Sequence, residues 1–290
     1  MKLRRVLPFI CAVFSSVPLV AQEHLPASTK ALLATQSHLR VLTQSDLAEV
    51  SSKARSGDKK AQYWLALVYG EGQLVPKDET ASRSWMLKSA EQGYAPAQTG
   101  MGQTYLPQGH ATTAREYGEA DRWLRLAAMQ DDAEAQFWLG TGYEQGWFGA
   151  IDYREALRWL RKAAHQELPD AQFCLGQMYE DGEGIPESDV IAALWYRKAA
   201  DHSPTWLGGV WEAVTKLVDM YREGRLPRDD VQAYMWSAIL DSSSNPPTDE
   251  DIKRISRRMS KAQIAEAQRR AEDWIKRHPF ETQTLAQAER

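Results

Sequence analysis

Side chains that could carry catalysis are few in this chain and lie far apart in the sequence. The six histidines are His24, His38, His110, His165, His202 and His278. The sequence contains no HExxH, CxxC, GxSxG or GxxxxGK[ST] string, which are the spacings that gather zinc ligands, redox thiols, a serine nucleophile or a phosphate-binding loop. The sequence therefore predicts no catalytic residue and no cofactor-binding residue.

Isolated reactive residues fit structural roles better than chemical ones. His165 and His202 each follow an Ala pair, and we interpret both as polar residues of turns. Cys174 has no histidine nearby in the sequence, so we expect a small buried hydrophobic residue rather than a nucleophile. Nearby acidic residues are Asp181, Glu183, Glu187 and Asp189. Their spacing is not that of an EF-hand, so the sequence predicts no metal site.

A repeat of about 36 residues dominates the sequence and must be considered before any local structure. The first halves of its units are AQYWLALVYGEG from Ala61, AQTGMGQTYLPQG from Ala97, AQFWLGTGYEQG from Ala135, AQFCLGQMYEDG from Ala171 and a weaker AVTKLVDMYREG from Ala213. The second halves centre on Trp85, Trp123, Trp159 and Trp195. Such a period predicts helical units that stack on their neighbours, since one unit cannot bury its own apolar faces.

The small residues of each unit predict where helices approach and end. A small residue follows the Leu or Met of the first half at Ala66, Gly102, Gly140 and Gly176, where a neighbouring helix can come close. Glycines suited to helix ends are Gly72, Gly146, Gly182 and Gly224. Acidic caps of the second helices are Asp78, Asp152, Asp189 and Asp229. Asp152 with Glu155 is typical of a capping box.

The combined pattern, A-x-x-x-L-G-x-x-Y-x-x-G, a proline-containing acidic loop and A-x-x-W-x-x-K-A-A, closely resembles the Sel1-like repeat, a relative of the tetratricopeptide repeat. The resemblance covers residues 61 to about 236 in five units, although the loop 106–118 and the fifth unit depart from the motif. It implies an all-α fold, a right-handed α/α solenoid of about five helical hairpins with helical caps. The segment after AYMWSAIL resembles a terminal cap, and Ser260 with Gln263 is expected to cap the last helix.

The resemblance also implies a function, because Sel1-like proteins act as adaptors in envelope processes, secretion, signalling or quality control. An exported branch of the family has paired cysteines in each repeat, and some of its members bind or hydrolyse penicillins. This chain contains only Cys11 and Cys174, so neither that disulfide framework nor that activity is carried over.

The first 21 residues have the layout of a secretory signal peptide: MKLRR, an apolar stretch of about 15 residues, and Ala21 before a polar run. The apolar stretch is short for a membrane span, which needs roughly 20 residues. A retained anchor is the alternative, and Ile10 before Cys11 disfavours a lipid anchor. We expect a periplasmic protein that starts near Gln22 and has no membrane span after cleavage.

Charge and cysteine content narrow the class of partner. Without residues 1–21 the chain has 32 basic and 39 acidic residues, which argues against a nucleic-acid partner. Cys174 is then the only thiol, so an internal disulfide is excluded. We expect a monomer that binds a protein, either an envelope protein or a secreted effector.

The domain organisation follows from the limits of the repeats. We predict a signal peptide at 1–21, a flexible lead at 22–44, a repeat solenoid at 45–241, a helical cap at 242–278 and a disordered tail at 279–290. Within the solenoid, residues 45–57 are expected to form a first helix that covers the open end of the stack.

A partner-binding stripe is expected along the concave side, which the first helices line in stacked hairpins. Offsets 3, 6 and 10 of each first helix share one face and are not needed for the repeat itself. The candidate residues are Trp64, Leu67, Glu71, Gln103, Trp138, Thr141, Gln145, Gln177 and Asp181. Tryptophans often anchor interfaces, which favours binding by Trp64 and Trp138. The alternative is that both pack against adjacent helices.

Two irregular segments add aromatic candidates. GWFGAID places Trp147 and Phe148 in a turn, and six extra residues before the fifth unit bring Trp206 and Trp211. Insertions in a repeat array map to loops, which often carry binding. The alternative is that these aromatic side chains cover the ends of neighbouring helices.

The sequence favours an exported, non-catalytic scaffold that binds a partner in the groove of the solenoid. One alternative is a periplasmic immunity protein that neutralises a secreted toxin. The enzyme alternative is a cell-wall or β-lactam hydrolase, which requires a polar pocket with a perturbed acid or base. No residues with a recognisable spacing supply one.

Overall fold

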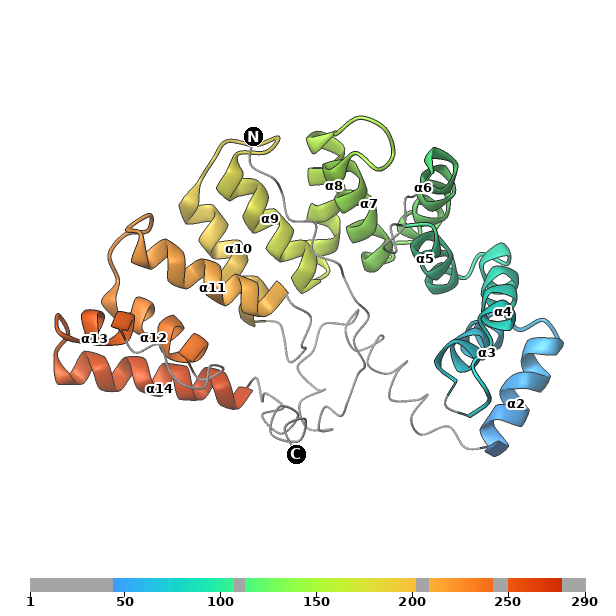
Figure 1. Cartoon of the computed structure of the whole chain (residues 1–290), viewed down its shortest axis with the longest axis horizontal. Helices are drawn as coiled ribbons and strands as arrows, with labels where there is room; N and C mark the ends of the chain where they lie inside the picture. Colours follow the sequence, from blue (N-terminus) through green and yellow to red (C-terminus); the bar gives the residue numbers. More distant parts are fainter. Residues whose placement is uncertain (1–43, 73, 107–112, 202–208, 242–249, 278–290) are drawn as a thin grey trace. The chain divides into compact units, whose positions relative to one another are not determined.

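A computed structural model describes residues 44–72, 74–106, 113–201, 209–241 and 250–277. These residues form thirteen α-helices and no β-strand, which confirms the all-α prediction (Figure 1). The contacts between helices define two compact units, which are described separately. Unit 1 contains the described residues up to Gln166 and unit 2 those from Glu167 onward, so the predicted repeat region is divided between them.

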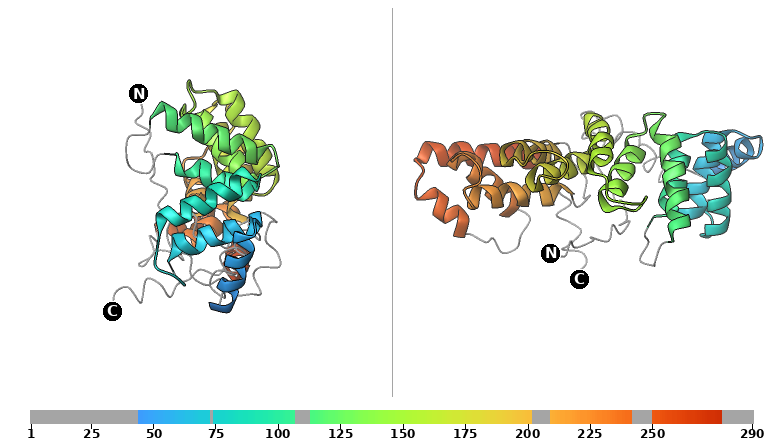
Figure 2. Two further views of the ribbon diagram at one scale, coloured as in Figure 1. Left: turned by 90° about the vertical axis from the view of Figure 1, so that its right-hand side faces the viewer. Right: turned by 90° about the horizontal axis from the view of Figure 1, so that it is seen from above.

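Unit 1 is built from one leading helix and three helical hairpins. Its helices are α2 (Gln44–Arg55), α3 (Lys59–Glu71), α4 (Glu79–Glu91), α5 (Ala95–Thr104), α6 (Ala114–Ala128), α7 (Ala133–Gln145) and α8 (Tyr153–His165). The hairpins are α3/α4, α5/α6 and α7/α8, and each packs on the next (Figure 2). The leading helix packs on α3, where Leu47 and Ala54 join the buried cluster of Leu65 and Val68.

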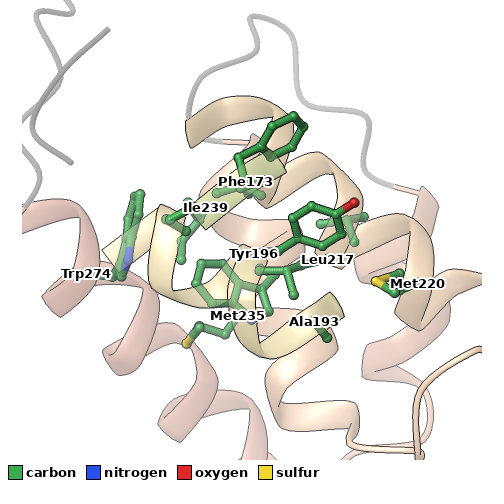
Figure 3. Packing of buried hydrophobic residues seen from close by; sticks show 14 of the residues in the cluster. Phe173, Ala193, Tyr196, Leu217, Met220, Met235, Ile239 and Trp274 are labelled. Carbon is green, nitrogen blue, oxygen red and sulfur yellow. The ribbon is translucent and has the colours of Figure 1, made fainter. Parts of the chain in front are cut away.

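Unit 2 contains the remaining helices. They are α9 (Pro169–Asp181), α10 (Asp189–Asp201), α11 (Gly209–Arg222), α12 (Asp230–Asp241), α13 (Glu250–Ser256) and α14 (Lys261–Arg277). Helices α9 to α12 pack consecutively, and α13 and α14 both pack against α12. The main core includes Tyr196, Leu217 and Ile239, and Trp274 of α14 closes it from one side (Figure 3). The ring of Trp274 meets Trp236 edge to face, with centroids 6.0 Å apart.

The glycines inside the first helices allow close packing of the hairpins, as the sequence predicts. A Cβ atom at Gly102 or Gly140 would lie 2.6 or 2.5 Å from the Cγ atom of Leu124 or Leu160 in the second helix. A Cβ atom at Gly176 would lie 2.5 Å from the ring of Tyr196. A side chain at any of these positions would therefore push the paired helix away.

Helix ends follow most of the predicted signals. Gly72, Gly146 and Gly182 end α3, α7 and α9 with φ of 71°, 72° and 69°, the left-handed conformation that glycine adopts most easily. The carboxylates of Asp78, Asp152 and Asp229 accept hydrogen bonds from backbone N–H groups at the starts of α4, α8 and α12. Ser260 and Gln263 cap α14 reciprocally, as expected.

Two capping predictions are wrong. Asp189 is the first residue of α10 and pairs with Arg225, while the hydroxyl of Ser188 accepts the hydrogen bond from the N–H of Ile191. Glu155 does not complete a capping box with Asp152, because its carboxylate accepts hydrogen bonds from Arg158 instead. Both carboxylates have a nearby guanidinium group, which forms a stronger, charge-assisted hydrogen bond.

A buried glutamine links consecutive hairpins of unit 1. Gln62, Gln98 and Gln136 directly follow the first alanine of their repeats and are at most 5% exposed. Each donates to a carbonyl at the end of the preceding helix, and the acceptors are Ala54 at 3.1 Å, Ala90 at 3.1 Å and Ala128 at 3.3 Å. Each also accepts from a second glutamine, and the donors are Gln92 at 2.7 Å, Gln130 at 2.7 Å and Gln166 at 2.9 Å. These bonds satisfy helix-end carbonyls that water cannot reach.

Candidate protein-binding surface

The predicted stripe of unit 1 begins on α3, where the two large side chains also serve the core. Trp64 and Leu67 are half-buried and pack against the cluster that contains Leu47 and Leu65. Glu71, at the end of α3, is exposed. Part of each of these two side chains, Trp64 and Leu67, therefore packs against the core, as the alternative proposed. The rest of each side chain is open to solvent.

Helix α7 of the predicted stripe and the turn that follows it carry most of the aromatic candidates of unit 1. Trp138 is half-buried, and its ring stacks on that of Trp147 with centroids 6.5 Å apart and planes 27° apart. Trp147 stacks in turn on Tyr117 of α6, at 6.4 Å and 12°. These three half-buried rings are named the aromatic stack. The sequence placed Trp138 and Trp147 in separate candidate groups, and the structure brings them together.

The turn after α7 positions the aromatic stack. The backbone N–H of Trp147 donates to the carbonyl of Gly142 over 2.8 Å, which folds the turn back onto the helix. Phe148 packs so closely on Gly142 that a Cβ atom there would lie 2.0 Å from the ring. Its ring also meets Tyr143 edge to face at 5.4 Å. Phe148 therefore covers the end of α7, the alternative considered for it, while Trp147 is directed toward Trp138.

The polar candidates of unit 1 differ in their exposure to solvent. Gln145 is exposed, whereas Gln103 is half-buried and donates to the carboxylate of Glu134 over 2.6 Å. The hydroxyl oxygen of Thr141 is buried and forms no hydrogen bond with a described residue. Thr141 can thus offer a partner its methyl surface but not its hydroxyl group.

In unit 2 the predicted stripe is polar. Gln177 and Cys174 of α9 are half-buried, and Asp181 is exposed. Trp206 lies outside the described residues. Trp211 lies in the first turn of α11, but its side chain is also outside the described part of the structure.

A buried ion network that the sequence did not predict joins three helices of unit 2. The carboxylate of Glu180 accepts hydrogen bonds from the Tyr196 hydroxyl at 2.5 Å, Lys216 at 2.9 Å and Arg225 at 2.7 Å. Its side chain is only 10% exposed. Burial alone would raise the pKa of Glu180, but these donors hold it below its usual value. Glu180 stands at offset 9 of its repeat, as Glu144 does in the third unit, and the predicted offsets 3, 6 and 10 leave that position out.

Asp170 at the start of α9 and Glu212 at the start of α11 were also not among the residues predicted from the sequence. Burial, together with the charge of Glu212, raises the pKa of Asp170 to about 6. The pKa of Glu212 is raised by burial as well. Each residue stands directly before the first alanine of its repeat, a position that the predicted offsets 3, 6 and 10 leave out. Asp170 forms no ion pair with another described residue.

These side chains offer a surface for packing and hydrogen bonding. Within the described ranges, no group of three or more His, Cys, Asp or Glu side chains could hold a metal ion. The same ranges contain no helix that is both long and apolar enough to span a bilayer. The tryptophans and the tyrosine of the aromatic stack are residue types enriched in protein interfaces.

Comparisons with known proteins address the repeats directly. A family model described as the Sel1 repeat matches five times, at residues 59–94, 95–132, 133–168, 169–204 and 212–238. These ranges coincide with the hairpins built from α3 to α12. A comparison with curated protein sequences finds no match.

Solved structures provide the second comparison. A Sel1 repeat protein from Oxalobacter formigenes is 25% identical, with a TM-score of 0.56 over 88% of this chain and 94% of that protein. A protective antigen of uropathogenic Escherichia coli with an SLR fold is 24% identical, with a TM-score of 0.49 over 91% of this chain. This chain spans 64% of that antigen's length. An immunity protein from Pseudomonas aeruginosa is 18% identical, with a TM-score of 0.44 over 94% of each chain.

The five matches cover more than half of the chain, and the structure repeats the hairpin at the same positions. The glycine contacts and left-handed helix ends explain why the repeat motif requires small residues there. This protein belongs to the Sel1 repeat family.

Proposed function

We propose that this protein is an exported, non-catalytic scaffold that binds a protein partner through the first-helix side of its Sel1 repeats. The observation that supports this proposal is the aromatic stack of Tyr117, Trp138 and Trp147, in which Trp138 of the predicted stripe stacks on Trp147 of the following turn. All three rings retain accessible surface although apolar area is favourably buried. Rigid, half-exposed aromatic side chains are the usual anchors of protein interfaces.

The stack is suited to anchoring because its geometry exists before a partner arrives. Trp147 is fixed through its backbone hydrogen bond to Gly142, and Trp138 is fixed by Phe137, whose ring meets it at 5.2 Å. Ordering flexible side chains at an interface costs free energy, and preformed anchors avoid most of that cost. Gln145 and Glu71 supply exposed polar groups in the same unit.

The test of this surface is binding by a doubly substituted protein. Trp138→Ala with Trp147→Ala should abolish capture of a defined partner from envelope extracts, with mass spectrometry identifying the partner and purified components confirming the loss. A matched control is Trp85→Ala, a half-buried tryptophan on the second helix α4 that is covered by Lys88. If the folded double variant binds the purified partner as tightly as the parent, the aromatic stack is not the anchor.

Export is the second part of the proposal, and the charged and apolar pattern of residues 1–21 supports it. Expression of the full chain in a Gram-negative host should give a periplasmic protein whose N-terminal sequence begins near Gln22. Recovery of an uncleaved protein in the membrane fraction would support the anchor alternative instead.

A further inference from the structure

A small pocket with an unusual concentration of arginines lies in unit 2, between α11, α12 and α13. Its volume is about 210 Å³, and its rim carries Arg222, Arg228, Arg254 and Arg258. All four arginine side chains are exposed. Pockets for cofactors and drug-sized molecules usually measure roughly 300 to 1,000 Å³, so this one suits a single side chain.

Two of the four pocket arginines share a single carboxylate of the lining, while Arg222 pairs with Asp219 of α11. Arg228 and Arg258 share one carboxylate, that of Asp230, at 2.8 and 2.9 Å. The other acidic residue of the pocket, Asp229, accepts the hydrogen bond from the N–H of Gln232 that caps α12. Each guanidinium group has five N–H donors, so sharing Asp230 leaves most of the donors of Arg228 and Arg258 available.

Charge in this region is opposite to that of the whole protein. The lining of the pocket carries four arginines and two aspartates, a local excess of positive charge, whereas the full chain has a net charge of −4. The side chain of Asp230 is only 14% exposed, and hydrogen bonds from Arg228 hold its pKa below the usual value, with Arg258 contributing. Asp230 therefore stays ionised and keeps two arginines at the rim of the pocket.

The inner wall of the pocket is apolar. Val218, Ala233 and Ile255 are each less than 10% exposed, and Leu226 is half-buried beside them. A glutamate side chain combines two methylene groups with a terminal carboxylate, so it matches an apolar wall below an arginine rim. An inorganic phosphate or a nucleic-acid backbone would use the rim but leave the wall uncovered.

We propose that this pocket is a second binding site, which accepts a glutamate side chain from an acidic segment of a protein partner. Bidentate pairing with the arginines recognises the carboxylate, and the excess positive charge accelerates association with acidic segments. The site uses no residue of the aromatic stack, so either proposal can fail without the other.

The test is binding of a fluorescein-labelled hexaglutamate peptide to the purified protein, followed by fluorescence anisotropy at low ionic strength. We expect saturable binding, no binding of hexaglutamine, and loss of affinity with added salt. Arg254→Gln with Arg258→Gln should weaken binding about tenfold, as expected for two partly exposed charge-assisted pairs. Arg228→Gln, in an exposed loop, should weaken it about threefold by the same reasoning.

The matched control removes the same charge away from the pocket. Arg269→Gln with Lys276→Gln changes two exposed residues of α14 that do not line it, and it should change affinity by less than about twofold. Equal weakening by both double variants would mean diffuse charge attraction and would overturn the proposal. Displacement of the peptide by a single-stranded oligonucleotide at lower concentration than by unlabelled hexaglutamate would also overturn it, as would the absence of saturable binding.

Discussion

Successive hairpins are joined by buried glutamine side chains in unit 1 and by an ion network centred on a glutamate in unit 2. In unit 1, buried glutamines such as Gln136 connect each hairpin to the helix ends before it. In unit 2, Glu180 collects Tyr196, Lys216 and Arg225 from three different segments. One repeat scaffold thus tolerates two kinds of polar contact. The contrast indicates that close packing of the paired helices depends on the small residues that both units share. The polar contacts differ between the units, and we expect them to determine how stability responds to pH.

The largest loss of stability is expected at a feature that both units share, the glycine of the first helix that packs against the second helix of the same hairpin. Gly140→Ala and Gly176→Ala should each lower the free energy of unfolding by about 2 to 3 kcal/mol, because the added Cβ would lie 2.5 Å from Leu160 or Tyr196. The loss should be greater for Gly176→Ala, since moving Tyr196 also disturbs its hydrogen bond to Glu180. Urea denaturation followed by tryptophan fluorescence measures both.

The control for these substitutions is Gly118→Ala, because Gly118 is an exposed helical glycine and a methyl group there would have no neighbouring atom within 4 Å. It should stabilise α6 by about 0.5 to 1 kcal/mol, the helix propensity of alanine over glycine. Equal stability of Gly176→Ala and the parent would refute the close-packing explanation.

An intermediate loss of stability is expected when either the glutamate network of unit 2 or a buried glutamine of unit 1 is removed. Glu180→Gln should lower the free energy of unfolding by about 1 to 2 kcal/mol at pH 7, less than for a fully buried pair because Lys216 and Arg225 are partly exposed. Gln136→Met should lower it by a similar amount, since it removes the donor to the Ala128 carbonyl and one acceptor of Gln166, which keeps its hydrogen bonds to Asp131.

The stabilities of Glu180→Gln and Gln136→Met should respond differently to low pH. The folded state lowers the pKa of Glu180, so its stabilising contribution is present above the pKa of the unfolded chain and disappears as pH falls through the folded value. The difference in stability between Glu180→Gln and the parent should therefore shrink as the pH falls below about 4.5, while the difference for Gln136→Met persists. A constant deficit for Glu180→Gln down to pH 3 would contradict the assignment of a charged contact.

The smallest expected change is an increase in the free energy of unfolding, on substitution of Asp170. The folded state raises the pKa of Asp170 to about 6, so the unfolded chain releases this proton first as pH rises, and stability falls between about pH 4 and pH 6. Asp170→Asn should therefore raise the free energy of unfolding by about 1 kcal/mol at pH 7.5 and leave it unchanged at pH 4. Glu187→Gln, an exposed control in a loop of the same unit, should change it by less than about 0.5 kcal/mol at either pH.

Much of the fold was predictable because the repeat motif is local. Gly146 and Gly182 end helices and Asp152 begins one, and these effects depend only on residues within a few positions. The pairing of Asp189 was not predictable, because Arg225 lies 36 residues away and competes for the same carboxylate. The candidate site was predicted in part: Trp138 and Trp147 were named separately, but their stacking depends on how the turn folds onto Gly142.

The family, the hairpin boundaries and the glycine positions can all be read from the amino-acid sequence, since a motif repeated every 36 residues or so reports the packing that all copies share. Folding in three dimensions was needed to show which unshared residues meet: Tyr117 with Trp147, Glu180 with Lys216 and Arg225, and four arginines around one pocket. The physical reason is that these contacts join side chains from different helices or loops, so their distances depend on packing and leave no periodic trace in the sequence.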